Sequence, residues 1–285
     1  MINELKENGY TIIHNVLSAK EVTHSLKMFY SWKETVPNHD IIHKECDPHG
    51  IYKYNQAGHQ DFAWFIRTRP SVKNVFETVW HTNELTVSFD GSCFIPKEFD
   101  GQDKFWCHSD QSPKYNFFKC YQGLVALTDN KERTLVVWDK THLTHHEYFK
   151  NIGREKDPSN WQRIPNEDED TLKPLKRVLH VPAGSMVLWD SRLFHQNQYG
   201  PAGCEERVVQ YVCMLPKNVK TNSAHQQKKR QLYFDTKRMT SHYPYPIKVN
   251  SLQSRHWGNP DLVIDYNALR EPDLSDYMTQ IKELL

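Results

Sequence analysis

Hydrophobic side chains recur with helical spacing in the first third of this chain and with strand spacing in much of the rest. Ser18 and Glu21 have the spacing of a capping box, which predicts that a helix begins directly after Ser18. Apolar positions predict two more helices over residues 61–68 and 70–79, the second of which opens with a proline. Residues 37–59 are predicted to be loop, because prolines, asparagines and glycines interrupt them.

The second part of the chain alternates between apolar and polar residues over short segments that end in turns. We expect strands over residues 85–89, 92–95, 105–110, 115–127, 134–138, 177–181, 186–189 and 207–215. A helix over 144–152 and a polar insertion over 153–174 interrupt the strands, and a helix over 222–238 follows them. Many short strands wrapped by helices predict a mainly β fold with flanking helices (α+β) and a jelly-roll core.

The length of 285 residues suits one domain of this kind with helical additions. We expect a helical N-terminal part over about 1–82, a jelly-roll core over about 84–215 and a C-terminal helical extension over about 216–285. The triplet Lys228-Lys229-Arg230 in this extension is predicted to lie on a solvated helix face.

Charge and cysteine usage exclude several classes of partner. The chain has 36 Lys and Arg against 35 Asp and Glu, so its net charge indicates neither a nucleic acid nor a membrane as partner. It shows no signal peptide and no apolar run long enough to span a bilayer. The six cysteines form no CxxC pair, which favours free thiols in the cytoplasm over a zinc site. Nothing in the sequence indicates the oligomeric state.

Candidate chemistry lies at His108 and Asp110, which are two residues apart on a predicted strand. Side chains at positions i and i+2 of a strand point to the same face, so an imidazole and a carboxylate are presented together. His195 lies at the end of a later apolar segment, and Arg207 begins the next strand twelve residues on. Two histidines and one carboxylate can hold non-haem Fe(II) on one side and leave its other positions open. The alternative is a pair of hydrogen-bonded histidines in a purely structural sandwich.

Two segments of the chain resemble the phytanoyl-CoA dioxygenase family. The first holds His108-Ser109-Asp110-Gln111, then Gly123 to Asp129, Leu135-Val136-Val137 and Thr141-His142; the second holds Gly184, Trp189-Asp190-Ser191, His195 and Arg207. The opening Gly9-Tyr10 with Val16-Leu17-Ser18 is also similar, so that the resemblance covers roughly residues 9–215. These enzymes depend on Fe(II) and 2-oxoglutarate and have a double-stranded β-helix core.

The resemblance implies a role for each matching residue. His108, Asp110 and His195 would be the iron ligands, and Arg207 would bind the distal carboxylate of 2-oxoglutarate. Asn197 and Gln122 are further candidates for 2-oxoglutarate binding. Gln111 and Trp189 are candidates for the substrate pocket. For the two glutamines, the alternative is that they only satisfy local backbone groups.

The resemblance implies a dioxygenase that uses Fe(II), 2-oxoglutarate and O2 to hydroxylate a C–H bond of a small molecule, with release of succinate and CO2. Two alternatives remain open: a non-catalytic module that binds a metal and a keto acid, and an oxygenase that acts on a protein side chain. Residues 130–133 and Asp139-Lys140 replace the family's glycine-rich turn and Pro-Gly, so the namesake substrate does not carry over. We expect residues 153–174 and 216–260 to cover the mouth of the site.

Overall fold

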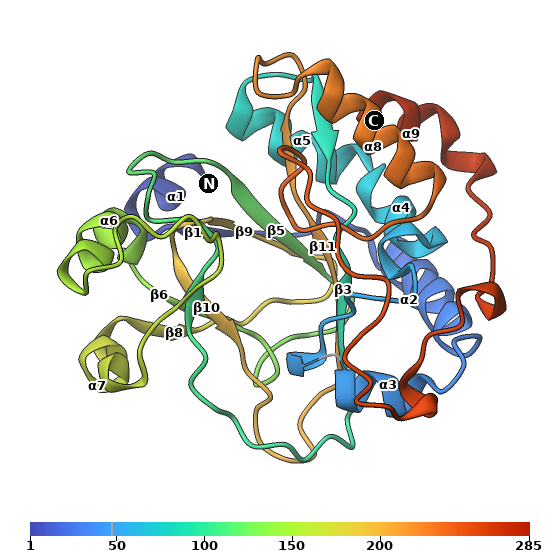
Figure 1. The fold of residues 1–285 in the computed structure, drawn as a ribbon, viewed down its shortest axis with the longest axis horizontal. Helices are drawn as coiled ribbons and strands as arrows, with labels where there is room; N and C mark the ends of the chain where they lie inside the picture. The colour runs from blue at the N-terminus through green and yellow to red at the C-terminus, as the bar shows by residue number, and fades with distance from the viewer. Residues whose placement is uncertain (47) are drawn as a thin grey trace.

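Two five-stranded antiparallel sheets face each other in the computed structural model, which describes residues 1–46 and 48–285 (Figure 1). One sheet has the strand order β1-β9-β5-β11-β3 and the other β7-β4-β10-β6-β8, while β12 and β2 form a separate pair. The strands are β1 (Tyr10–Ile13), β2 (Leu85–Val87), β3 (Ser92–Ile95), β4 (His108–Ser109), β5 (Tyr121–Ala126), β6 (Leu135–Trp138), β7 (Gln162–Arg163), β8 (Lys176–Val178), β9 (Met186–Asp190), β10 (Phe194–Asn197), β11 (Arg207–Val212) and β12 (Met214–Pro216). Between β3 and β11 the chain passes repeatedly from one sheet to the other, which agrees with the predicted jelly roll.

Strand periodicity decides which side chains fill the space between the sheets. On β5, Leu124 and Ala126 point into the core that both sheets share, while Val125 points outward to the helices. The partner strand β9 behaves in the same way, with Val187 inside and Met186 outside. Because both faces of this sheet are covered, its strands are apolar on both sides rather than strictly alternating.

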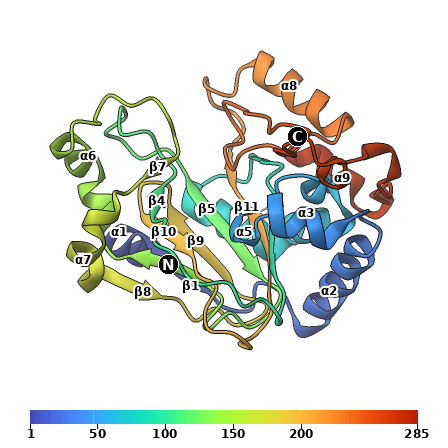
Figure 2. The ribbon, with the colours of Figure 1, turned by 60° about the horizontal axis from the view of Figure 1, so that its bottom comes forward.

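Helices cover the outer faces of both sheets (Figures 1 and 2). They are α1 (Ile2–Asn8), α2 (Ala19–Lys33), α3 (His39–Cys46), α4 (Asp61–Arg67), α5 (Pro70–Trp80), α6 (Thr141–Asn151), α7 (Glu169–Leu172), α8 (Ala224–Asp235) and α9 (Met278–Leu284). Helices α2, α4 and α5 lie on the side of the β11 and β3 sheet, while α6 and α7 lie beside the other sheet. No helix of the described residues combines the length and the apolar character needed to cross a bilayer.

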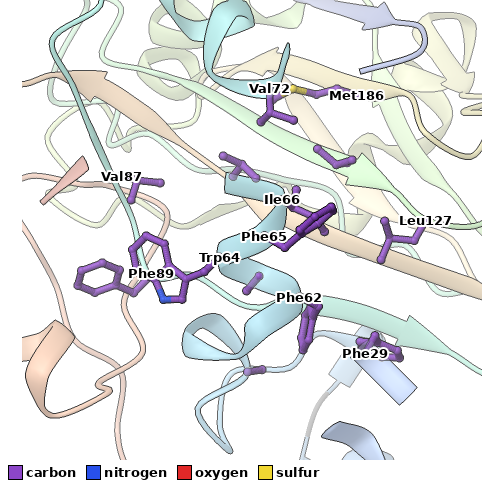
Figure 3. Close-up of a cluster of buried hydrophobic side chains, with 14 of the residues drawn as sticks. Phe29, Phe62, Trp64, Phe65, Ile66, Val72, Val87, Phe89, Leu127 and Met186 are labelled. Carbon is purple, nitrogen blue, oxygen red and sulfur yellow. The ribbon is translucent and has the colours of Figure 1, made fainter. Parts of the chain in front are cut away.

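Helix α4 holds the largest hydrophobic cluster together (Figure 3). Its Phe62 packs edge-on against Phe29 of α2 at 5.2 Å between ring centroids, and its Trp64 packs on Phe89. Met186 and Leu127 supply the sheet side of the same cluster. Burial of these large apolar side chains anchors the N-terminal helices to the sheet that carries β5, β9 and β11.

The prediction that residues 37–59 form a loop is wrong in part, because α3 and two short 3-10 turns lie there. Helix α3 buries Ile42 and packs the rings of His39 and His43 against Tyr52. These contacts come from outside the helix, so the local pattern of prolines and glycines did not indicate them. The predicted capping box at Ser18 and Glu21 is confirmed, with both reciprocal hydrogen bonds present.

The triplet Lys228-Lys229-Arg230 on α8 is not wholly solvated, contrary to the prediction. Lys228 is exposed, but Arg230 is completely buried. Its guanidinium donates to the carbonyl of Pro244 at 2.6 Å and to the side chain of Asn222 at 3.3 Å. Arg230 therefore ties α8 to the segment that follows it, and only part of the triplet faces solvent.

Candidate metal centre and its cavity

The pairing of β4 with β10 brings the two predicted histidines together. His195 lies directly opposite His108 in this antiparallel pair, and Asp110 follows β4 by one residue. The Oδ2 of Asp110 is 3.3 Å from Nε2 of His195 and 3.9 Å from Nε2 of His108. One ligand atom from each residue lies within 4.8 Å of the others, and no other described group of three such side chains has this geometry. The pairing of β4 with β10 thus brings together two histidines that are 87 residues apart in the sequence.

Hydrogen bonds fix the orientation of both imidazoles. Nδ1 of His108 donates to the carbonyl of Trp106 at 3.2 Å, and Nδ1 of His195 donates to the carbonyl of Leu193 at 2.9 Å. With the proton on Nδ1, the lone pair of each Nε2 is directed at the shared space. Burial lowers the pKa of His108 to about 3, so this ring is neutral near pH 7 and can act as a ligand.

Asp110 completes the donor set as an ionised carboxylate. Burial opposes its ionisation, but the imidazole of His195, at 3.3 Å, and that of His108 hold the pKa of the carboxyl below its usual value. Gln122 Nε2 donates to Oδ2 of Asp110 at 2.9 Å, and the Tyr243 hydroxyl donates to its backbone carbonyl at 3.0 Å. The carboxylate is therefore held by an amide from β5, and the backbone of Asp110 by a phenol from the C-terminal part of the chain.

The donor set fits a divalent transition metal such as Fe(II). Two imidazoles and one carboxylate converge from one side, which is the facial triad of non-haem iron sites. The other side opens into a cavity of about 510 Å³, which the triad helps to line. A metal held there would keep coordination positions free for exogenous ligands.

Arg207, the first residue of β11, is not among the residues that line this cavity. It is completely buried, on the same strand face as Tyr211, whose side chain lines the cavity. Its Nε and Nη1 donate at 3.3 and 3.4 Å to Asn130 and to the carbonyl of Thr134. Its Nη2 is buried without a hydrogen-bond partner among the described residues. A buried cationic nitrogen without an acceptor suits the carboxylate of an absent ligand.

The other predicted site residues differ in their placement. Asn197 and Trp189 line the cavity, and the indole Nε1 of Trp189 is buried without a partner among the described residues. Asn197 Nδ2 donates to the Tyr211 hydroxyl at 3.2 Å. Gln122 lines the cavity as well, with its amide on Asp110.

Gln111 does not reach the cavity, which corrects its expected place in the substrate pocket. Its Nε2 donates to the carbonyls of Tyr115 and Phe117, and its Oε1 accepts from the Lys119 amide and the Ser191 hydroxyl. All of the hydrogen-bonding capacity of its side chain is used within the loop between β4 and β5 and on Ser191, which follows β9. This loop also explains why β5 begins at Tyr121 rather than at residue 115.

Two segments without a recognisable motif contribute much of the remaining lining. Residues 159–161 come from the insertion between α6 and β7, and Thr240, Ser241, His242, Tyr243, Lys248 and Asn250 come from the C-terminal part of the chain. Both lie within the ranges expected to cover the mouth, 153–174 and 216–260. The individual residues could not be selected from the sequence, because each segment is irregular and polar.

This chain is similar in sequence and in fold to known proteins. The profile of the phytanoyl-CoA dioxygenase (PhyH) family matches residues 5–198. Ava biosynthesis cluster protein O of Aspergillus versicolor is 28% identical over 253 residues, or 80% of this chain and 80% of that protein. GlcNAc Inducible Gene 2 of Candida albicans shares the fold with a TM-score of 0.58 and 16% identity, over 75% of this chain and 62% of that chain. The present chain therefore spans less than two thirds of the Candida protein.

A second solved structure shares the fold. HygX from Streptomyces hygroscopicus, with nickel and 2-oxoglutarate bound, has a TM-score of 0.52 and 12% identity, over 76% of this chain and 86% of that chain. At 16% and 12% identity, these two structures show a common fold with this chain. The relationship in sequence is shown by the match to the family profile.

Proposed function

This chain belongs to the phytanoyl-CoA dioxygenase (PhyH) family and is a 2-oxoglutarate-dependent non-haem iron oxygenase, and we propose that it hydroxylates a C–H bond of a small organic molecule. Its cofactors are Fe(II), 2-oxoglutarate and O2, and succinate and CO2 are released. The observation that carries the proposal is the convergence of His108, Asp110 and His195 at the wall of a cavity of about 510 Å³.

The proposal assigns a role to each side chain of the centre. Nε2 of His108, Nε2 of His195 and Oδ2 of Asp110 hold the iron, because these three atoms already face one another. Arg207 holds the distal carboxylate of 2-oxoglutarate, because its Nη2 is buried and lacks an acceptor among the described residues. Gln122 keeps Asp110 oriented through the hydrogen bond to Oδ2.

When bound, Fe(II), 2-oxoglutarate and O2 supply the oxidising chemistry, in which one oxygen atom enters succinate and the other enters the substrate. The chain contributes position and environment. The hydrogen bonds at Nδ1 keep both imidazoles aligned. The indole rings of Trp106 and Trp161, at 4.8 and 5.8 Å from the ring of His108, restrict the access of water to that ligand.

The shape of the cavity favours a small molecule over a protein side chain. Its volume of about 510 Å³ falls in the range of pockets that enclose most of a small ligand. Segments from the insertion and from the C-terminal part of the chain add to its lining. The family relationship makes this chain an oxygenase rather than a non-catalytic binding module.

The experiment measures succinate formation from 2-oxoglutarate in the presence of Fe(II), ascorbate and a library of small organic compounds. Compounds that stimulate turnover are then incubated under 18O2. We expect the stimulating compound to gain one 18O atom, and we expect no product with His195→Ala. His180→Ala, at an exposed histidine away from the cavity, serves as the matched control and should retain turnover. A stimulating compound that is transformed without gaining 18O would contradict hydroxylation.

A further inference from the structure

The wall of the cavity beside the metal centre carries buried polar atoms whose hydrogen bonds are unmet within the described residues. These atoms are Oε1 of Gln122, Nε1 of Trp189 and Nε2 of His242, and all three residues line the cavity. Gln122 and Trp189 are 4% and 3% exposed. An unmet buried donor or acceptor is unfavourable, so such atoms in the wall of a cavity indicate a polar ligand.

Strand register places Gln122 and Trp189 side by side. The strands β5 and β9 are antiparallel neighbours, and Gln122 is paired directly with Trp189. Residues paired in this way have their Cβ atoms about 5 Å apart, and both of these side chains line the same cavity. Adjacent side chains therefore present an amide oxygen, which accepts hydrogen bonds, and an indole N–H, which donates one.

Contacts with the metal centre fix the position of both side chains. Nε2 of Gln122 donates to Oδ2 of Asp110 at 2.9 Å, which fixes the amide and leaves Oε1 on its other side. The indole ring of Trp189 lies 5.5 Å from the imidazole of His195, measured between ring centroids. The pair therefore borders two of the three side chains that would hold the metal, where the reacting part of a substrate has to lie.

The pair is remote from Arg207. The amide of Leu127, directly after β5, donates to the carbonyl of Val208 at 2.9 Å, so the start of β11 lies beside the end of β5. Gln122 lies near the other end of β5, about 16 Å from Leu127 at the rise of an extended chain. A distal carboxylate of 2-oxoglutarate at Arg207 therefore leaves Oε1 of Gln122 and Nε1 of Trp189 for the substrate.

We propose that the substrate carries a neutral group that both accepts and donates hydrogen bonds, an amide or a hydroxyl, with its acceptor on Nε1 of Trp189 and its donor on Oε1 of Gln122. The inference rests on the proposed function for the identity of the adjacent metal centre. Neither side chain is charged, so the pair recognises hydrogen-bonding groups rather than ions. A carboxylate or a hydrocarbon of the same shape would leave one or both buried atoms unmet, and binding sites discriminate strongly on this basis.

The experiment measures binding of four probes by calorimetry to protein loaded with Mn(II) and saturating 2-oxoglutarate. The probes share a naphthalene ring: 2-naphthamide and 2-naphthalenemethanol donate and accept, 2-acetonaphthone only accepts, and 2-isopropenylnaphthalene does neither. We expect the amide or the alcohol to bind about fivefold more tightly than 2-acetonaphthone, and 2-acetonaphthone about fivefold more tightly than the hydrocarbon. The amide and alcohol arms decide which group is preferred.

Variants separate the two halves of the pair. Trp189→Phe keeps an aromatic ring but removes the donor, so 2-acetonaphthone should lose its advantage over the hydrocarbon. Gln122→Leu, studied at Mn(II) concentrations that saturate it, removes the acceptor, so the amide and the alcohol should lose their advantage over 2-acetonaphthone. The matched control Trp257→Phe removes an indole that is 74% exposed and outside the cavity, and it should bind all four probes as the wild type does.

The proposal is overturned if the hydrocarbon binds the wild type as tightly as the amide and the alcohol, if neither of these two binds, or if neither variant changes the order of the probes. The affinity for 2-oxoglutarate is measured in the same preparations and should stay within about threefold in Trp189→Phe. A loss of more than about tenfold with an unchanged order of the probes would assign Trp189 to the cosubstrate and overturn the proposal.

Succinate formation with Fe(II) separates this inference from the proposed function. A preference for the amide or the alcohol without succinate formation would contradict the proposed function and leave this inference standing. Succinate formation without that preference would do the reverse.

Discussion

Arg207 differs from Arg133, another fully buried arginine, in what its guanidinium contacts. Arg133 is as deeply buried, but its nitrogens donate to the carbonyls of Pro96, Lys97, Phe99 and Tyr199. Arg133 therefore serves to fold the loop after β3. In Arg207, by contrast, Nη2 has no acceptor among the described residues, as expected of a nitrogen that binds a ligand.

For Arg207→Gln, we predict that the KM for 2-oxoglutarate rises roughly 30-fold or more, because loss of a buried charge-assisted contact costs about 2 kcal/mol or more. Affinity for Mn(II), measured by calorimetry without 2-oxoglutarate, should stay within about threefold, because Arg207 does not contact the triad. A KM for 2-oxoglutarate that is unchanged in a folded variant would remove Arg207 from the site.

For Gln122→Leu, we predict weaker metal binding. The amide donates to the same oxygen of Asp110 that faces both imidazoles, so its loss frees the carboxylate to rotate. Groups that orient metal ligands typically contribute 10- to 100-fold to metal affinity, and calorimetric titration with Mn(II) checks the value. Gln111→Leu should weaken the loop between β4 and β5 instead, with less effect on metal affinity, and equal metal affinity in Gln122→Leu and wild type would contradict the role.

Sequence alone could predict those residues of the metal centre that share a strand face or match a position of the family motif. His108 and Asp110 share a strand face, and the register between β4 and β10 then brings His195 beside them. The sequence could not predict that Lys248 and His242 line the cavity, because only tertiary packing brings residues 239–250 to it. Gln111 was misplaced for a related reason, since its proximity to Asp110 in sequence says nothing about which way the chain turns.

At the scale of elements, the site depends on how α8 is attached. Arg230 bonds to Pro244 and Asn222 from the inner face of this helix, and its burial was not visible in a triplet of basic residues. Helix α3 escaped prediction in the same way, because contacts of His39 and His43 with Tyr52 stabilise it from outside. Elements with strong internal periodicity, such as α2 and α5, could be predicted.

For Arg230→Met, we predict that the free energy of unfolding falls by about 3 kcal/mol, because the carbonyl of Pro244 and the side chain of Asn222 lose their buried donor. Urea denaturation measures the change. Lys228→Met, on the exposed face of the same helix, should stay within about 0.5 kcal/mol of wild type. Equal effects of the two substitutions would contradict the anchoring role of Arg230.

At the scale of the whole molecule, several histidines are buried in neutral form. Burial lowers the pKa of His59 and of His145 to about 3 in the folded chain, against about 6.5 in the unfolded chain. Between these values the unfolded state binds more protons than the folded state. The stabilising contribution of each neutral histidine is therefore complete above pH 6.5 and is lost as the pH falls toward 3.

For His59→Gln, we predict a smaller loss of stability in acid. In the wild type without metal, His59 should contribute a loss of about 1.4 kcal/mol between pH 7.5 and pH 5.5. Urea denaturation in EDTA at both pH values measures the difference, which should be smaller in the variant by about this amount. Identical pH dependence of the two proteins would show that His59 is not buried in neutral form.

The whole fold combines the family match over residues 5–198 with C-terminal residues that complete the lining of the cavity. The sandwich places the triad in the wall of a cavity, and residues 159–161 and several residues of 240–250 add to its lining. The reaction class therefore follows from the family, whereas the substrate has to be inferred from the residues that line the cavity.

The central claim is that His108, Asp110 and His195 form an iron centre that consumes 2-oxoglutarate, and the conversion of 2-oxoglutarate to succinate without added substrate tests it most directly. We predict slow, Fe(II)-dependent succinate formation by the wild type and by His180→Ala. We predict none above background for His108→Ala or Asp110→Ala, with each variant shown to be folded by its thermal transition. Undiminished succinate formation by folded His108→Ala and Asp110→Ala would contradict the account.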